Sequence, residues 1–257
     1  MHTLINANCL DYLQSGHQTW TTIFADPPDN IGLGYANYRD KLPDAEYVKL
    51  LSDWLHAFVY KAKTVWFSYN ARWTFHVGGI VAGMLDRVRG LEAKPCVQTF
   101  TFGQHCHHDL GNNHRPLLRL RWFDAPLCPD AIRVPSWRQE NGDKRADPRG
   151  RVPGDVFDFT RVVGNSKQRR PWHPTQLNEG LVERCIKLTT GEGDSVLDPF
   201  GGTGTTLRVC KAINRICTLI ELDPGYCDKI VEEHNLTPLP YCHRKVWEAQ
   251  PSDEQRR

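Results

Sequence analysis

The sequence has no apolar run long enough to cross a membrane and almost no net charge. No segment of the 257 residues approaches the about 18 consecutive apolar residues that a membrane span requires. The first residues, Met1 to Asn6, do not combine a basic start with an apolar stretch as a secretory signal does. We therefore expect a cytoplasmic protein without a membrane partner. The formal net charge of +2 excludes a polycation, so any nucleic-acid surface must come from local charge asymmetry.

Disulfide and zinc frameworks are also missing. The nine cysteines are scattered without regular spacing, which fits reduced thiols better than a disulfide-bonded secreted domain. Histidines gather in His105-Cys106-His107-His108-Asp109, with His114 nearby, but without the paired spacing of a structural zinc site. Adjacent side chains on an extended segment point to opposite faces, so we predict no metal site.

Two stretches of regular α/β pattern flank an irregular middle. Before it, apolar and amphipathic runs predict strands at 21–25, 64–68 and 97–102 and a helix from about Asp44. After it, they predict helices at 177–190, from about Thr205 and after Pro224, and strands at 195–197 and 217–220. This alternation predicts a doubly wound α/β fold with a mostly parallel sheet.

A glycine-rich loop follows the predicted strand at 195–197. It reads Asp198-Pro199-Phe200-Gly201-Gly202-Thr203-Gly204-Thr205-Thr206, and Glu221 ends the next strand. Glycines let the backbone approach a ligand, a helix N-terminus offers free N–H groups, and a carboxylate about 20 residues on can accept both ribose hydroxyls. The pattern indicates a site for a nucleoside-containing cofactor, although a plain strand-to-helix turn also uses flexible residues.

A second polar loop, Asp26-Pro27-Pro28-Asp29-Asn30, ends the strand at 21–25. Open α/β sheets bind ligands at the carboxyl ends of their strands, so both loops are expected to meet at one crevice. An amine conjugated to a heteroaromatic ring is a poor nucleophile. Asp26 could accept a hydrogen bond from such an amine, and the carbonyl of Pro27 could accept another. Alone, Asp-Pro-Pro is also an ordinary strand-ending turn.

The two loops, together with His173-Pro174-Thr175-Gln176, resemble the permuted β-class of DNA amino-methyltransferases. In that family an Asp-Pro-Pro-Tyr motif comes first, a target-recognition region follows, and an Asp-Pro-Phe-x-Gly-x-Gly loop lies near the C-terminus. The opening stretch from Ile5 to Leu10 is also similar to the family's N-terminal segment. The resemblance covers about residues 1–70 and 171–235.

The resemblance implies a Rossmann-like methyltransferase fold that uses S-adenosyl-L-methionine. It implies one domain over 1–257, with a catalytic half at about 1–102, an inserted loop-rich recognition lobe at about 103–172, a cofactor-binding half at about 173–237 and a polar, frayed tail at about 238–257. It assigns catalysis to the loop Asp26, Pro27, Pro28 and Asp29. The expected cofactor-binding residues are Asp198, Phe200, Gly201, Gly202, Thr203, Gly204, Thr205, Glu221, His173 and Gln176.

The catalytic loop departs from the family at its fourth residue, where Asp29 replaces an aromatic ring that stacks on the extruded base. A carboxylate cannot stack, and an aromatic platform returns about 1 to 3 kcal/mol of the cost of base flipping. Tyr35 and Tyr38 follow closely and are the candidates to replace this ring.

The middle of the chain is locally basic. From Arg115 to Arg170, Lys and Arg outnumber Asp and Glu by roughly two to one, and tryptophans are interspersed. Arginine neutralises phosphate and reads guanine, and tryptophan stacks on bases, so this region is expected to bind DNA. A solvated loop balanced by its own acidic residues is the alternative. The expected contacts are Arg119, Arg121, Arg138, Arg169 and Arg170.

The sequence thus predicts direct methyl transfer to the exocyclic amine of adenine (N6) in duplex DNA, with the base flipped out. N4-cytosine is the close alternative. A cofactor- and nucleic-acid-binding protein without catalysis, and an enzyme acting on RNA or a free nucleotide, are the rivals from other classes. No cysteine lies beside the catalytic loop, which argues against the attack that carbon-5 methylation uses. The resemblance also allows a homodimer and a cognate restriction nuclease as partners.

Overall fold

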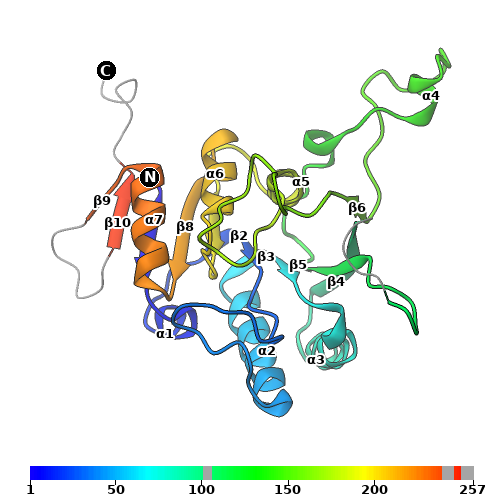
Figure 1. The fold of residues 1–257 in the computed structure, drawn as a ribbon. Coiled ribbons are helices and arrows are strands. Elements are labelled where there is room, and N and C mark those ends of the chain that lie inside the picture. Colours follow the sequence, from blue (N-terminus) through cyan, green and yellow to red (C-terminus); the bar gives the residue numbers. More distant parts are fainter. Residues whose placement is uncertain (101–105, 239–245, 250–257) are drawn as a thin grey trace, which may run out of the picture.

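The computed structural model describes residues 1–100, 106–238 and 246–249, and its centre is one ten-stranded sheet. The strands lie in the order β6-β4-β5-β3-β2-β7-β8-β1-β10-β9 (Figure 1). Their bounds are β1 Thr3–Asn6, β2 Trp20–Ala25, β3 Ala62–Ser68, β4 Leu91–Thr99, β5 His114–Trp122, β6 Val156–Asp158, β7 Ser195–Asp198, β8 Ile216–Glu221, β9 Leu236–Pro238 and β10 Val246–Ala249.

The five central strands, β3, β2, β7, β8 and β1, are all parallel. On one side the sheet continues through β5 and β4, paired antiparallel, and β6, which runs parallel to β4. On the other side β10 and β9 add antiparallel strands. The predicted α/β fold with a mostly parallel core is confirmed.

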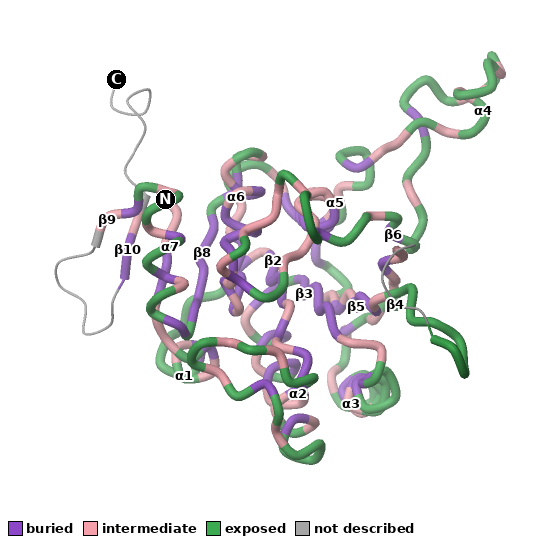
Figure 2. Tube along the Cα trace, viewed as in Figure 1, coloured by how far each residue is buried: buried purple, intermediate pink, exposed green. Residues whose placement is uncertain are grey.

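Helices cover both faces of the sheet. The helices are α1 Cys9–Gln14, α2 Asp44–Val59, α3 Thr74–Arg87, α4 Trp137–Glu140, α5 Glu179–Thr189, α6 Thr205–Ala212 and α7 Pro224–His234, with short 3-10 turns at Ala71–Trp73 and Pro129–Ile132. Side chains of α1, α2 and α3 share one buried cluster with Ile23, whereas α5, α6 and α7 share the other with Phe24. Successive residues of a strand face opposite sides, so the central strands are apolar on both (Figure 2).

Strand β5 corrects the expected boundary of the inserted lobe. The sequence predicted an irregular region from about residue 103, yet nine residues of it form a strand between β3 and β4. Leu118 and Leu120 are buried, while Arg119 and Arg121 alternate with them. The long polar side chains disguised a period-two strand pattern. The loop-rich insertion is therefore shorter than expected and begins after Trp122.

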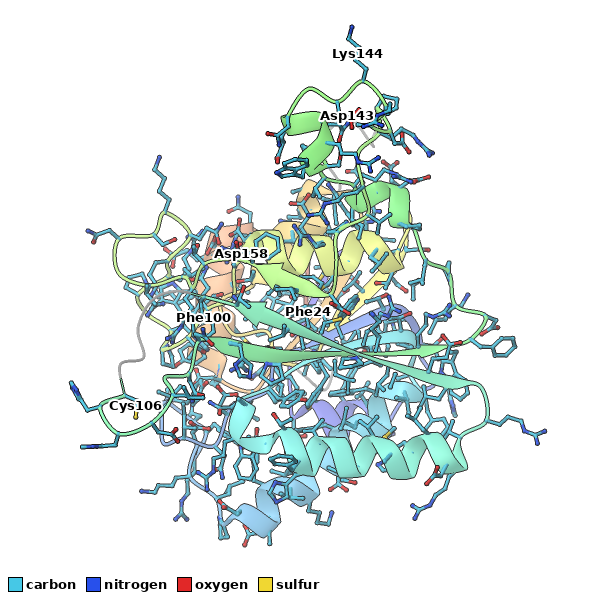
Figure 3. All side chains as sticks on the ribbon, turned by 90° about the vertical axis from the view of Figure 1, so that its right-hand side faces the viewer. Phe24, Phe100, Cys106, Asp143, Lys144 and Asp158 are labelled. Carbon is cyan, nitrogen blue, oxygen red and sulfur yellow. The ribbon has the colours of Figure 1, made fainter. Side chains whose placement is uncertain are left out.

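Residues 123–155, here named the projecting segment, leave the end of β5 and return at β6. Figure 3 shows Asp143 and Lys144 at its far end, away from the sheet. A bridge between Val134 and Arg151 and a hydrogen bond from Arg133 to the carbonyl of Gly150 hold its two sides together. The segment contacts the body where Cys128 donates its backbone N–H to the carbonyl of Leu188, in the last turn of α5.

The expected frayed tail is also partly wrong. Within residues 238–257 the structure describes Pro238 and 246–249, and the latter form β10 against β1. Val246 and Trp247 are buried there, which explains the pairing. The last residues of the predicted strand at 97–102 and His105 lie outside the described residues.

The described residues include neither a helix that could span a membrane nor a cluster of metal ligands. None of the described helices is both long and apolar enough to cross a membrane. In the same part of the chain, no three His, Cys, Asp or Glu side chains are grouped so that they could hold a metal ion.

Candidate active site

The two polar loops predicted from the sequence meet at one pocket. They follow β2 and β7, which are neighbours in the sheet, and the helices after these strands cover opposite faces. This is the reversal point at which open α/β sheets bind ligands. The pocket has a volume of about 690 Å³ and is lined by both loops, by Glu221 and by the segment from His173 to Asn178. Of the predicted catalytic and cofactor residues, only Gly204 is not in its wall.

The loop after β2 owes its shape to backbone hydrogen bonds. Asp40 accepts the N–H groups of Asn30, Ile31 and Leu33 at 2.7, 3.2 and 2.9 Å. Asn30 takes a left-handed conformation with φ of 58° and bonds to both backbone groups of Leu42. Asparagine tolerates that conformation better than other non-glycine residues. The loop is thereby held in place, and Ile31 and Leu33 form part of the pocket wall.

Two aromatic residues bind the carbonyls of the catalytic loop. Tyr47 donates its hydroxyl to the carbonyl of Pro28 at 2.5 Å, and Trp73 donates its indole N–H to the carbonyl of Asp29 at 2.8 Å. Among the described residues no hydrogen bond reaches the carbonyl of Pro27, which lines the pocket. The expected second acceptor for an amine is therefore free of a partner in that part of the chain.

Asp29 lines the pocket, and its carboxylate forms an ion pair. Its two carboxylate oxygens accept Nη1 and Nη2 of Arg115 at 2.7 and 2.9 Å. The same guanidinium donates to Oδ1 of Asp26 at 2.7 Å and, through Nε, to the hydroxyl of Ser68 at 2.6 Å. Burial raises the pKa of Asp26, and the positive charge of Arg115 opposes that rise.

The glycine-rich loop forms the other wall of the pocket. Gly202 and Gly204 have φ values of 49° and 72°, in the left-handed region that glycine adopts at little cost. A Cβ on Gly202 would lie 3.3 Å from Nε2 of His173, so the loop packs tightly against the predicted closing segment. Helix α6 then begins at Thr205, with its first N–H groups near the pocket.

Two buried carboxylates lie beside this loop. Glu221 accepts the backbone N–H groups of Gly202 and Asp223, at 2.7 and 2.8 Å. Asp198 accepts the N–H of Phe200 at 2.9 Å. Burial raises the pKa of each side chain to about 7. An acidic, partly protonated wall suits a ligand that carries positive charge and hydroxyl groups.

The segment before α5 closes the pocket. The ring of His173 lies 4.7 Å from that of Tyr226, and Nδ1 of His173 bonds to the carbonyl of Thr175 at 2.6 Å. Burial lowers the pKa of His173, so the ring is neutral near pH 7. Gln176 also lines the pocket, but its amide bonds to the backbone of Arg170 and Gln168 and shapes the segment itself.

The predicted DNA contacts divide into four groups, the last of which is Arg119 and Arg121. Tyr35 and Tyr38 line the pocket, with the Tyr38 hydroxyl buried and without a partner among the described residues. Arg138 is exposed on the projecting segment. Arg170 pairs with Glu233 of α7 at 2.6 Å, which anchors the closing segment, and the adjacent Arg169 donates to the carbonyl of Arg170.

Arg119 and Arg121 do not line the pocket. Arg121 pairs with Thr64 near the start of β3, at the sheet edge opposite the pocket. It forms an ion pair with Glu92, while the Arg119 guanidinium lies over the ring of Trp66. These side chains are engaged with Glu92 and Trp66, so the structure does not bring them to the pocket with the other predicted residues.

Sequence reasoning missed Arg115 and Arg161 as pocket residues. Arg115 was placed only within the basic region, because its function depends on a strand that was not predicted. Arg161 lines the pocket and lies over the ring of Phe100 at 5.3 Å. No local motif marks either residue.

The chain is similar in fold to solved structures, among them a DNA methyltransferase. The crystal structure of the M1.HpyAVI–SAM complex matches with a TM-score of 0.59 and 16% identity, covering 91% of this chain and 100% of that chain. The PvuII DNA methyltransferase, described as cytosine-N4-specific, matches with a TM-score of 0.64 and 15% identity over 87% of this chain and 82% of that one. At these identities the likeness shows the fold.

Curated relatives are similar in sequence. Type II methyltransferase M.HpaI of Haemophilus parainfluenzae is 31% identical over 82% of this chain and 66% of its own length. Type II methyltransferase M.BglII of Bacillus subtilis is 35% identical over 57% of this chain and 41% of its own length. DNA adenine methyltransferase YhdJ of Escherichia coli (strain K12) is 29% identical over 79% of this chain and 72% of its own length.

The chain spans less than two thirds of the length of M.HpaI and M.BglII. A family model described as DNA methylase, for N6 and N4 methylation, matches residues 21–233, which include both pocket loops and the closing segment. The chain therefore belongs to this DNA methylase family.

Proposed function

We propose that this chain transfers a methyl group from S-adenosyl-L-methionine to the exocyclic amine of adenine in DNA. One observation carries the proposal: the carboxylate of Asp26 and the glycine-rich loop line a single pocket of about 690 Å³. A pocket of this size accommodates a nucleoside cofactor and part of a second ligand. The acceptor for an amine and the site for a methyl donor therefore lie together.

The residues present fit this cofactor. Gly202 leaves space that a Cβ would take from His173, and Asp198 and Glu221 give the wall an acidic character suited to a sulfonium cation. Glu221 would accept the ribose hydroxyls, and the first turn of α6 would face the polar end. When bound, S-adenosyl-L-methionine supplies an electrophilic methyl group.

The protein's part in the reaction is to orient and desolvate the amine. Asp26 would accept one N–H of the amine and the carbonyl of Pro27 the other, which directs the nitrogen lone pair toward the methyl carbon. As the new N–C bond forms, the bond from the methyl carbon to the sulfonium sulfur would break and the sulfur would leave as a neutral thioether. The methylated nitrogen becomes more acidic, and its surplus proton would leave toward Asp26. No covalent intermediate with the protein is required.

Adenine is preferred over cytosine because the catalytic loop begins with Asp26. In the family that the sequence resembles, N4-cytosine enzymes more often begin this loop with serine. N4-cytosine is the alternative within the same reaction class, and the family model includes both bases.

The test is methyl transfer from labelled S-adenosyl-L-methionine to unmethylated duplex DNA, followed by digestion and mass spectrometry of nucleosides. We expect labelled N6-methyladenine, and loss of at least about 100-fold in rate for Asp26→Ala. Asp53→Ala is the matched control, since Asp53 lies on α2 in an exposed pair with Lys49. Cofactor binding without label in DNA would contradict the proposal and favour a binding protein or an RNA substrate. Labelled N4-methylcytosine would correct the base.

A further inference from the structure

A buried arginine holds the two carboxylates of the catalytic loop in one network. Arg115 lies on β5, and its side chain is 19% exposed. Its guanidinium nitrogens lie 2.7 Å from a carboxylate oxygen of Asp26 and 2.7 Å from one of Asp29. Four of the five guanidinium N–H groups are used, by Asp26, Asp29 and Ser68. A guanidinium bound on three sides cannot rotate, so the carboxylate of Asp26 is fixed with it.

The network has an unequal distribution of charge. One cation faces two anions, and Asp29 takes two of the cation's hydrogen bonds in a bidentate pair, whereas Asp26 takes one. Asp29 is thus the anchor of Arg115, and Asp26 keeps acceptor capacity for another donor. The hydroxyl of Ser68 accepts a hydrogen bond from Nε of Arg115. It also hydrogen-bonds to the side chain of Asp26, so all four side chains form one connected network.

We propose that Arg115, anchored by Asp29, is a positioning residue that keeps Asp26 ionised and aimed into the pocket. The fourth residue of the catalytic loop then acts through charge and orientation, in place of a stacking ring. This inference rests on the proposed role of Asp26 as amine acceptor. It differs from a purely structural ion pair because it requires the network to set the protonation of Asp26.

The two partners of the network act on Asp26 in opposite directions. The positive charge of Arg115 favours ionised Asp26, and the negative charge of Asp29 disfavours it. Arg115→Gln should therefore raise the pKa of Asp26, while Asp29→Asn should lower it. The NMR shifts test whether the network sets the protonation of Asp26, and the pH profile of methyl transfer tests whether that protonation controls the reaction.

The first measurement is the pKa of Asp26 by carboxyl NMR of the full chain labelled with carbon-13 aspartate, assigned with Asp26→Asn. An upward shift of about one unit or more is expected for Arg115→Gln, and a downward shift for Asp29→Asn. Arg121→Gln is the matched control, because Arg121 lies on the same strand and pairs with Glu92 at the opposite edge. Equal pKa values in wild type and Asp29→Asn would overturn the inference, even where Arg115→Gln does not fold.

The second measurement is the pH profile of single-turnover methyl transfer with saturating DNA and cofactor. The acid limb should move up for Arg115→Gln, so that the rate at pH 6 falls about 10-fold or more relative to wild type, with a smaller loss at pH 9. Arg115→Lys should restore the position of the limb in part, since it restores charge without the bidentate pair. An unmoved limb with a uniform loss of rate at every pH would contradict the inference.

The two proposals fail separately. If wild-type protein transfers no methyl group to DNA, the proposed function falls, but the NMR measurement still decides whether Arg115 and Asp29 control Asp26. If wild type is active and its pKa of Asp26 is insensitive to both variants, the function stands and this inference falls.

Discussion

Tyr35 meets His173 edge-on, with the two ring centroids 5.7 Å apart. Tyr35 belongs to the loop that follows β2, whereas His173 belongs to the segment that closes over the glycine-rich loop. Tyr38 packs edge-on against Tyr35 at 6.2 Å. The catalytic loop thus brings an aromatic ring to the pocket, although its fourth residue is an aspartate.

Tyr35→Ala is expected to weaken capture of the extruded base. Base–aromatic stacking contributes about 1 to 3 kcal/mol, which corresponds to roughly 5- to 150-fold in binding. Tyr35→Phe keeps the ring and should retain most of the activity. The measurement is 2-aminopurine fluorescence at the target position together with single-turnover methyl transfer.

Tyr60→Ala is the control for Tyr35, because Tyr60 is 61% exposed and packs near Trp122, at the other end of β5. Tyr35→Ala with wild-type turnover and DNA affinity would remove Tyr35 from the role of stacking ring and direct attention to Tyr38.

Cofactor affinity is expected to rise with pH between about 6 and 8. The pKa values of Asp198 and Glu221 are raised to about 7, so both side chains are partly protonated at neutral pH. A bound cation favours their ionised forms, and binding should therefore release protons. Calorimetric titrations with S-adenosyl-L-methionine in two buffers of different ionisation enthalpy measure this release.

Glu221→Gln should weaken binding and reduce both the proton release and the pH dependence. The matched control is Glu192→Gln, since Glu192 is exposed in the turn before β7. Affinity that instead increased as the pH was lowered from 8 to 6 would contradict the assignment of these carboxylates to the cofactor site.

The sequence predicted the parts of the site that depend on local order along the chain. Asp26 and the loop from Asp198 to Thr205 end neighbouring parallel strands, and a strand, a turn and a helix are visible in local periodicity. Glu221 was predicted for the same reason, since it is the last residue of the next strand, β8. Each of these residues lines or adjoins the pocket through the parallel sheet alone.

The features that the sequence did not predict, Arg115 in the pocket and strands β5 and β10, depend on contacts between segments that are distant in the sequence. Arg115 reaches Asp29 across 86 positions of sequence, and its strand lies in the sheet only because β3 and β4 flank it. The alternation of Arg119 and Arg121 with leucines was the one local signal for that strand. Strand β10 was missed similarly, since its partner β1 lies at the other end of the chain. Pairing between remote segments is not encoded in any one window of residues.

Gly202→Ala is expected to impair cofactor binding by at least about 10-fold. A residue with a Cβ at φ of 49° is strained by about 1 to 2 kcal/mol, and this Cβ would also crowd His173 at 3.3 Å. The closing segment must then move from its position over the loop. Equilibrium dialysis with S-adenosyl-L-methionine and thermal unfolding measure the two effects.

Gly79→Ala is the control for Gly202, because it lies within α3 with nothing within 4 Å of the added Cβ. It should bind cofactor as wild type does and raise stability by about 0.5 to 1 kcal/mol. Undiminished cofactor affinity in Gly202→Ala would show that the loop does not approach the ligand closely.

Arg138→Ala tests whether the projecting segment reaches DNA. Arg138 is exposed on α4, which lies away from the sheet (Figure 1), and no hydrogen bond or ion pair of its side chain occurs among the described residues. If it neutralises one phosphate, the plot of log affinity against log salt should become shallower by about one unit, with little change in sequence preference. Arg87→Ala, an exposed arginine in the last turn of α3, is the control. An unchanged slope for Arg138→Ala would show that Arg138 contacts no phosphate, and would leave Arg161 in the pocket wall as the arginine to test next.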